Sequence, residues 1–160
     1  MPADSSAGTD QWCLRDSQSA QAWSRDMTLA AKVLVIDDSE VVLSRVKARL
    51  LAEGHQVIAT SQTVGVARLL REVDIVIIDY HMPGIDGKTL LDSLKAAAAQ
   101  SKLTPAFYVY SQDESLRMRA LQLGFDGCFT RKGDDEALVA QLNAVLRQVM
   151  LKRLAKSRNP

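Results

Sequence analysis

Short apolar runs separated by polar turns recur along the chain from Lys32 onward. Two of them, residues 33–36 and 75–78, are unbroken and rich in β-branched residues, which is typical of strands buried on both faces of a parallel sheet. Three further runs read as strands at residues 56–59, 106–110 and 128–130. The pattern therefore predicts five strands.

Between these runs, apolar residues recur every three or four positions, as they do along one side of a helix. The first predicted helix covers residues 39–53, where Ser39 can cap the amino end and Gly54 ends the apolar stripe. A modest helix is expected over residues 64–70, where Gly65 lowers the helical propensity. The remaining helices are predicted at residues 87–99, 114–123 and 134–155.

Strands and helices that alternate in this way predict an α/β fold. We expect a doubly wound, five-stranded parallel sheet with five helices, in three α/β/α layers. The last helix is longer than a compact domain needs, because its apolar positions continue about two turns further. Its end is basic and carries Arg147, Lys152, Arg153, Lys156 and Arg158. We expect a solvated helix end, and the alternative is a surface for a partner or for a homodimer.

Composition narrows the class of protein. The chain has 160 residues, of which 47% are hydrophobic, and this suffices for one domain with its own core. The formal net charge of +1 gives no general reason to expect direct contact with nucleic acid. No apolar segment reaches the roughly 20 residues of a membrane span, and the amino end lacks the pattern of a signal peptide. The two cysteines lie far apart, which favours a reduced, cytoplasmic setting.

The chain divides into three parts by composition. Residues 1–28 are polar and are expected to form a flexible leader. Residues 29–148 hold the predicted strands and helices and form the domain. Residues 149–160 are the basic extension of the last helix and the tail.

Acidic residues follow two of the predicted strands. Asp37 and Asp38 come directly after residues 33–36, and Asp79 comes directly after residues 75–78. Because the carboxyl ends of parallel strands meet at one edge of the sheet, these three carboxylates are expected to lie together. Like charges at that distance repel strongly unless a divalent cation is shared among them. Oxygen ligands without cysteine or histidine indicate a hard cation.

Four segments carry a more specific signal and occur in the order LVIDDSE, IVIIDYHMPGIDG, VYS and FTRKG. With them, the region from about residue 32 to residue 147 resembles the receiver domain of bacterial two-component response regulators, of the chemotaxis-regulator, CheY-like type. An acid pair alone is a weak signal, but matching residues at three strand ends are hard to meet by chance. The resemblance implies a flavodoxin-like fold with the strand order 2-1-3-4-5.

The resemblance also implies roles for residues at matching positions. Asp79 matches the carboxylate that accepts a phosphoryl group and becomes an aspartyl phosphate. Asp37, Asp38 and Asp79, together with the backbone carbonyl of His81, match the ligands of Mg²⁺. Ser111 matches the hydroxyl that turns inward to hydrogen-bond the phosphoryl group.

The last strand departs from the family pattern, in which an aromatic residue precedes a phosphate-pairing lysine by three positions and a proline usually follows. Phe129 and Lys132 keep that interval, so we expect them to be the switch residue and the phosphate-pairing residue. Counting from the preceding glycines instead puts Cys128 and Arg131 at these places, and this alternative stays open. Gly133 replaces the proline, which predicts a looser loop after the strand.

Two further positions bear on the lifetime of an aspartyl phosphate. His81 lies two residues after Asp79, and Asp113 lies two residues after Ser111. In resembling domains, residues at these places flank the path of the hydrolytic water. The alternative for His81 is an ordinary solvent-facing loop histidine.

The resemblance implies a stand-alone response regulator that takes a phosphoryl group from a histidine kinase or phosphotransfer protein and changes its contacts with a downstream protein. Apart from its own phosphorylation and slow dephosphorylation, it is not expected to be an enzyme. Too few residues follow the last helix for an output domain. The alternative is a pseudo-receiver that acts as a scaffold without phosphorylation, while a hydrolase with an aspartyl nucleophile is disfavoured because His81 stands where it needs a second acid.

Overall fold

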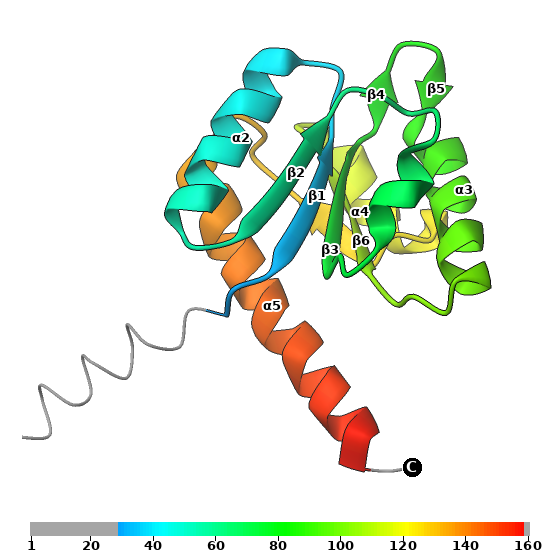
Figure 1. Cartoon of the computed structure of the whole chain (residues 1–160). Helices are drawn as coiled ribbons and strands as arrows, with labels where there is room; N and C mark the ends of the chain where they lie inside the picture. Colours follow the sequence, from blue (N-terminus) through cyan, green and yellow to red (C-terminus); the bar gives the residue numbers. More distant parts are fainter. Residues whose placement is uncertain (1–28, 159–160) are drawn as a thin grey trace, which may run out of the picture.

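The computed structural model describes residues 29–158, so the expected leader lies outside the described residues. At its centre is a parallel sheet of five strands in the order β2-β1-β3-β6-β7 (Figure 1). These strands are β1 (Lys32–Ile36), β2 (Gln56–Thr60), β3 (Ile75–Asp79), β6 (Ala106–Tyr110) and β7 (Gly127–Phe129). Numbered along the chain, the order is 2-1-3-4-5, which confirms the predicted doubly wound, flavodoxin-like fold.

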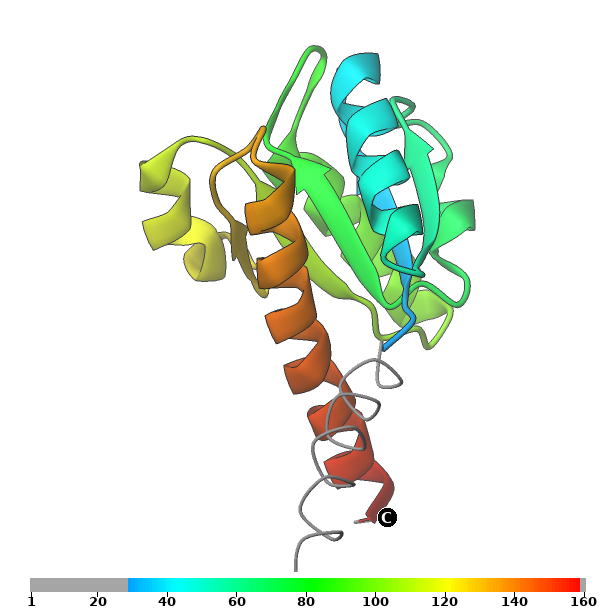
Figure 2. The same cartoon turned by 90° about the vertical axis from the view of Figure 1, so that its left-hand side faces the viewer.

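Helices cover both faces of this sheet (Figure 1 and Figure 2). On one face, α2 (Glu40–Ala52) and α5 (Asp135–Arg158) bury a cluster with the inward residues of β1, β3 and β6. On the other face, α3 (Gly87–Gln100), α4 (Glu114–Leu123) and the 3-10 helix η1 (Val66–Leu70) enclose a second cluster. The sheet therefore lies between two apolar layers, as predicted.

β3 is the central strand, and all five of its residues are buried. Ile75 and Ile77 face the α2 and α5 layer, whereas Val76 and Ile78 face the α3 layer. Burying each such side chain contributes about 1.5–3 kcal/mol. Because the strand pairs with β1 on one side and β6 on the other, Asp79 at its end has a closely defined position.

Local sequence signals explain most helix boundaries. The side chain of Ser39 accepts the backbone N–H of Val42 at the start of α2, and Asp86 accepts that of Thr89 at the start of α3. The helix predicted at residues 114–123 has these bounds in the structure, where Gly124 ends it in the left-handed conformation.

The structure corrects three expectations. The modest helix expected over residues 64–70 forms only as the short 3-10 helix η1, after Gly65. A small hairpin of β4 (His81–Met82) and β5 (Ile85–Asp86), joined by Pro83 and Gly84, was not expected. The last helix continues to Arg158, beyond its expected end at residue 155.

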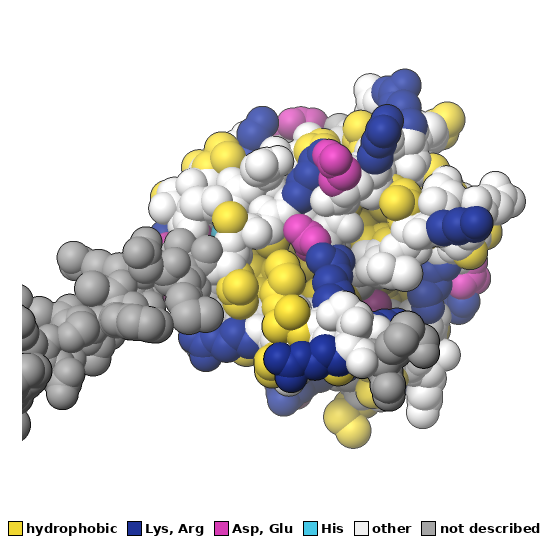
Figure 3. Space-filling view, turned by 60° about the horizontal axis from the view of Figure 1, so that its bottom comes forward, with side chains coloured by type: hydrophobic (Ala, Val, Ile, Leu, Met, Phe, Trp, Pro, Cys, Tyr) yellow, Lys and Arg dark blue, Asp and Glu magenta, His cyan; other side chains and the backbone are white. Residues whose placement is uncertain are grey.

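The lower end of α5 extends beyond the sheet (Figure 1). Arg153 attaches it to the domain by an ion pair of 2.5 Å with Asp74, which directly precedes β3. Leu151 and Leu154 are 66% and 61% exposed, and Figure 3 shows lysine and arginine side chains flanking hydrophobic ones at this end. A homodimer through this helix end stays a prediction. No helix among residues 29–158 has the length and apolar character to cross a membrane.

Candidate functional site

Three carboxylates meet at the carboxyl ends of β1 and β3. One oxygen from each of Asp37, Asp38 and Asp79 lies within 4.8 Å of the other two. Asp37 and Asp79 are buried, with 1% and 5% of their surface exposed, whereas Asp38 is exposed. The two strands are neighbours in the sheet, which brings their ends to the same edge. The sequence prediction that these residues lie together is thus met by the geometry.

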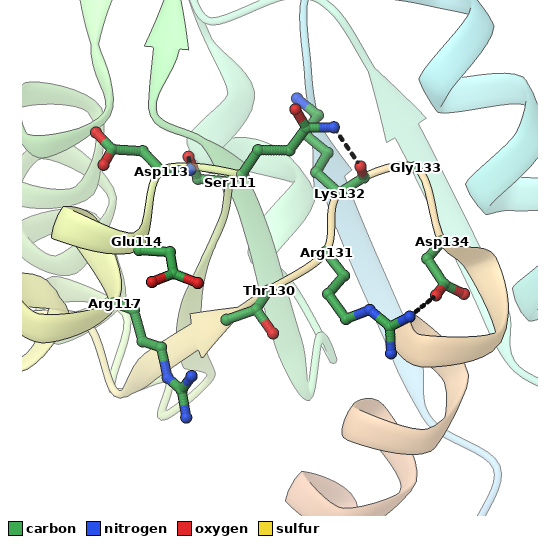
Figure 4. A pocket seen from close by; sticks show the side chains of 10 residues that line it. Ser111, Asp113, Glu114, Arg117, Thr130, Arg131, Lys132, Gly133 and Asp134 are labelled. Atoms are coloured by element: carbon green, nitrogen blue, oxygen red, sulfur yellow. Dashed lines mark hydrogen bonds and ion pairs between the residues drawn. The ribbon is translucent and has the colours of Figure 1, made fainter.

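A lysine offsets part of this negative charge. The ammonium nitrogen of Lys132, in the loop between β7 and α5, lies 2.5 Å from Oδ2 of Asp37 and 3.2 Å from Oδ1 of Asp79. Arg131 lies outside the cluster, because its guanidinium group pairs with Asp134 at 2.9 Å and points away from Lys132 (Figure 4). Of the two candidate cations, Lys132 is therefore the one beside the acids.

Burial and charge change the ionisation of the cluster. Burial first, and then the charge of Asp37, raise the pKa of Asp79, while Lys132 opposes this shift. Burial alone would lower the pKa of Lys132, but its contacts with Asp37 and Asp79 outweigh this effect and leave the pKa raised. The raised pKa keeps Lys132 charged at neutral pH, between the side chains of Asp37 and Asp79.

Ser111 follows β6 and stands beside the end of β3. It is buried, and its hydroxyl accepts the backbone N–H of Asp113 at 3.0 Å. Ser111 and Lys132 both line an open groove of about 700 Å³ between the loop that precedes α4 and the loop that precedes α5 (Figure 4). The groove therefore reaches Ser111 and Lys132, two residues at the edge of the acid cluster.

Phe129 lies in the interior of the domain, and its expected role as the switch residue stays a prediction. The ring is 1% exposed and stacks on Tyr108 at 4.7 Å in the cluster under α5. Cys128 instead has its partly buried side chain against the opposite cluster, which includes residues of α4. The alternating directions of strand side chains explain this result, because Phe129 and Cys128 are neighbours and must face opposite layers.

His81 and Asp113 lie close together near Asp79. The backbone N–H of His81 donates to Oδ1 of Asp79 at 3.3 Å, and Nε2 of His81 lies 3.9 Å from Oδ2 of Asp113. Hydrogen bonds from Ser115, and then the charge of His81, lower the pKa of Asp113. An effect of this pair on phosphoryl lifetime, and a role of the His81 carbonyl as a metal ligand, stay predictions.

The acid cluster fits a hard divalent cation by its donors. All three side chains offer carboxylate oxygens, which are the ligands that Mg²⁺ prefers. Oδ2 of Asp37 is buried and has no hydrogen-bond partner among the described residues, although it contacts the ammonium group of Lys132. Asp37, Asp38 and Asp79 are thus the residues that would hold the ion. A cation bound there offsets charge on an approaching phosphoryl group.

Sequence reasoning missed two residues next to the site, Tyr110 and Gln112. Both contact the backbone of the loop that carries Lys132. The only sequence signal was that they flank Ser111, which does not reveal what their side chains reach.

Carboxylates, a lysine and a hydroxyl meet at one edge of this doubly wound α/β domain, and such a set of groups suits the transfer of a phosphoryl group to a carboxylate. Comparison with protein families makes this assignment specific. Residues 33–143 match the family model described as the response regulator receiver domain. The chain therefore belongs to the receiver domain family of two-component response regulators.

Individual relatives agree with this assignment. The chain is 30% identical over 118 residues to Protein PilH of Pseudomonas aeruginosa, covering 72% of this chain and 98% of that protein. It is 32% identical over 119 residues to the transcriptional regulatory protein CpxR of Escherichia coli, covering 73% of this chain. The match spans only half, 50%, of the length of CpxR.

Solved structures with low sequence identity share the fold. The chemotaxis response regulator CheY4 of Vibrio cholerae matches with a TM-score of 0.61 and 20% identity, over 72% of this chain and 98% of that one. The signal receiver domain of a putative LuxO repressor protein from Vibrio parahaemolyticus matches with a TM-score of 0.65 and 16% identity, over 79% of this chain and 98% of that one.

Proposed function

We propose that this receiver accepts a phosphoryl group on Asp79 from a phosphohistidine of a histidine kinase or phosphotransfer protein, in a reaction that depends on Mg²⁺. One observation carries the proposal. The buried carboxylate of Asp79 ends the central strand and lies against the acid partners Asp37 and Asp38, beside the ammonium group of Lys132. A carboxylate buried beside other carboxylates costs stability, and such an arrangement is typical of a functional site.

The transfer follows from the groups at the site. A carboxylate oxygen of Asp79 attacks the phosphorus atom and forms an O–P bond, while the P–N bond of the donor breaks. The electron pair of that bond leaves with the imidazole of the donor, which takes up a proton. Lys132 offsets negative charge on the phosphoryl oxygens, and the hydroxyl of Ser111 donates a hydrogen bond to one of them.

The product changes contacts with a downstream protein. An aspartyl phosphate removes the negative charge from one carboxylate oxygen of Asp79 and adds phosphoryl oxygens, so Lys132 and Ser111 gain new partners. The loops that carry these two residues lead into α4 and α5, and we expect the target to read the surface there. The match to PilH spans 98% of that protein, so at least one relative consists of little more than a receiver domain.

Chemical phosphorylation tests the proposal directly. The purified chain is incubated with Mg²⁺ and acetyl phosphate, and the added mass and its sensitivity to hydroxylamine are measured, since hydroxylamine cleaves acyl phosphates. We expect one labile phosphoryl group on wild type and none on Asp79→Asn.

Asp92→Asn is the matched control, because Asp92 is an exposed carboxylate on α3 that pairs with Lys88 away from the site. It should be phosphorylated at the wild-type rate. Equal labelling of Asp79→Asn and wild type would refute Asp79 as the acceptor. A wild-type chain that stays unmodified would favour the phosphorylation-independent scaffold.

A further inference from the structure

The peptide group between Lys132 and Gly133 is held at both of its polar atoms by residues next to Ser111. The carbonyl oxygen of Lys132 accepts a hydrogen bond of 2.7 Å from the side-chain amide of Gln112, drawn as a dashed line in Figure 4. The backbone N–H of Gly133 donates to the hydroxyl of Tyr110 at 3.2 Å. Tyr110 directly precedes Ser111 and Gln112 directly follows it.

We propose that Tyr110 and Gln112 are positioning residues for Lys132, and that they keep its ammonium group between Asp37 and Asp79 by holding the Lys132–Gly133 peptide. The inference rests on the proposed function only for its catalytic consequence. The placement of Lys132 itself is a property of the structure that can be measured separately.

The backbone of this loop needs such restraint. Arg131 and Gly133, the two neighbours of Lys132, have positive φ angles of 59° and 101°. A residue with a side chain in this left-handed region costs about 1–2 kcal/mol, so Arg131 would relax if nothing opposed it. Glycine has no Cβ and leaves the backbone more freedom than other residues. Hydrogen bonds from outside the loop therefore add to the one within it, from the backbone N–H of Asp134 to the carbonyl oxygen of Arg131, in limiting its conformations.

Tyr110 is suited to this role because of where it lies. Its side chain is 1% exposed, and in the sheet Tyr110 pairs with Asp79 on one side and with Phe129 on the other. The ammonium group of Lys132 also lies 5.6 Å from the centre of the Tyr110 ring, within the range of a cation–π contact. The hydroxyl and the ring of one buried residue thus contact both the backbone and the side chain of the lysine region.

The glycine after Lys132 takes part in this arrangement. A proline at position 133 has no backbone N–H and cannot donate to Tyr110, whereas Gly133 can. The carbonyl oxygen of Gly133 in turn accepts a hydrogen bond of 2.9 Å from Arg45 of α2. In this chain the loop is thus restrained by hydrogen bonds to neighbouring elements.

Chemical labelling tests the placement of Lys132 without relying on phosphorylation. Lysines are acylated with limiting N-hydroxysuccinimide acetate, and labelling at each lysine is followed by peptide mass spectrometry. Tyr110→Phe and Gln112→Leu should each increase the labelling rate of Lys132 about fivefold, as expected for the loss of a hydrogen bond of ordinary strength. Lys88, which lies on α3, should be labelled at an unchanged rate.

Two controls separate positioning from general damage. Tyr108→Phe removes the hydroxyl of another tyrosine of β6 that faces the same layer, and should leave labelling at Lys132 unchanged. Gln112→Leu changes an exposed side chain and spares the core, so it keeps the test decisive if Tyr110→Phe unfolds. Unchanged labelling of Lys132 in Gln112→Leu, or an equal increase in Tyr108→Phe, would overturn the inference.

A kinetic measurement adds the catalytic consequence. Tyr110→Phe should slow phosphorylation by acetyl phosphate about fivefold, while the Mg²⁺ concentration for half-maximal thermal stabilisation changes less than twofold. A parallel change in both quantities would mean that the acid cluster itself is damaged and would overturn the positioning role. If the variants show the expected increase in labelling of Lys132 but wild type is not phosphorylated, the proposed function fails. The placement of Lys132 by Tyr110 and Gln112 then still stands.

Discussion

The two ends of β3 carry the same kind of residue in opposite circumstances. Asp74 precedes the strand and accepts the backbone N–H of Lys32 at 2.9 Å as well as the ion pair from Arg153. Asp79 ends the strand and shares Lys132 with a second buried acid, Asp37. At each end of β3 a cationic side chain from the carboxyl-terminal part of the chain pairs with an aspartate.

The difference lies in how completely each charge is compensated. Asp74 has a backbone donor and a guanidinium group to itself, and it holds α5 against the sheet. The opposite end has two buried carboxylates and one exposed one for a single ammonium group. Incomplete compensation destabilises the fold but leaves the site able to bind a cation and a phosphoryl group.

The largest difference in stability should appear when the cationic side chain at each end of β3 is replaced. Lys132→Met leaves two buried carboxylates without their partner and should lower the free energy of unfolding by about 3 kcal/mol in Mg²⁺-free buffer. Arg153→Met should cost about 1 kcal/mol, because that pair is more exposed and Asp74 keeps its backbone donor. Urea unfolding measures both, and Arg131→Met serves as a near-neutral control. Equal losses at both ends would contradict the comparison.

Neutralising the two aspartates should change stability in opposite directions. Asp74→Asn weakens two hydrogen bonds of a charged group and should lower the free energy of unfolding by about 2 kcal/mol. Asp79→Asn relieves the burial of a charge beside Asp37 and should raise it by about 1 kcal/mol. Denaturant midpoints for both variants at pH 7 check this, and a loss of stability in Asp79→Asn would refute the uneven compensation.

Mg²⁺ should stabilise the protein through the acid cluster at the Asp79 end of β3 and not through Asp74. A ligand that binds only the folded state raises the free energy of unfolding by about 1.4 kcal/mol at a concentration ten times its Kd. Mg²⁺ at such a concentration should therefore stabilise wild type by this amount. Arg153→Met should keep the full response, whereas Asp37→Asn should lose most of it, because it removes one donor of the cluster. Thermal unfolding in calcium-free buffer, with and without Mg²⁺, measures this stabilisation. An undiminished shift in Asp37→Asn would place the ion elsewhere.

The smallest expected effect is a dependence on pH. The pKa of Asp79 is raised above the ordinary 3.8, so in the folded protein this group takes up its proton at a higher pH than in the unfolded chain. Burying the charged form of Asp79 lowers the free energy of unfolding. This loss is complete above the raised pKa and disappears as the pH falls to about 3.8. The stability advantage of Asp79→Asn over wild type should therefore shrink on acidification. Urea titrations from pH 7 to pH 4 test the sign.

The sequence predicted the sheet and the acid cluster because these depend on local patterns. Unbroken β-branched runs indicated buried parallel strands, and the fold then brings the carboxyl ends of β1 and β3 to one edge. Capping residues predicted helix ends well where a single residue decides them, as with Gly124 after α4. The burial of Asp79 follows from the burial of the strand that carries it.

Contacts that depend on loop conformation were beyond the sequence. Arg131 has a positive φ, which residues other than glycine rarely adopt, and its side chain pairs with Asp134, away from the acid cluster. The spacing between Phe129 and Lys132 did not reveal that Phe129 faces the layer of α5, whereas Cys128 faces the opposite layer. The ion pair between Asp74 and Arg153 joins residues 79 positions apart and has no local signal.

The attachment of α5 has a mechanical consequence. This helix starts just after the loop that carries Lys132. About 27 Å further along its axis, Arg153 forms an ion pair with Asp74, which directly precedes β3. The carboxyl-terminal part of the chain is thus linked to both ends of β3, through Lys132 at Asp79 and through Arg153 at Asp74. A displacement of the loop that carries Lys132 can therefore be passed along α5 to the ion pair of Arg153 with Asp74. If the two sites are coupled in this way, a molecule that binds the exposed end of α5 would affect the loop to the same extent.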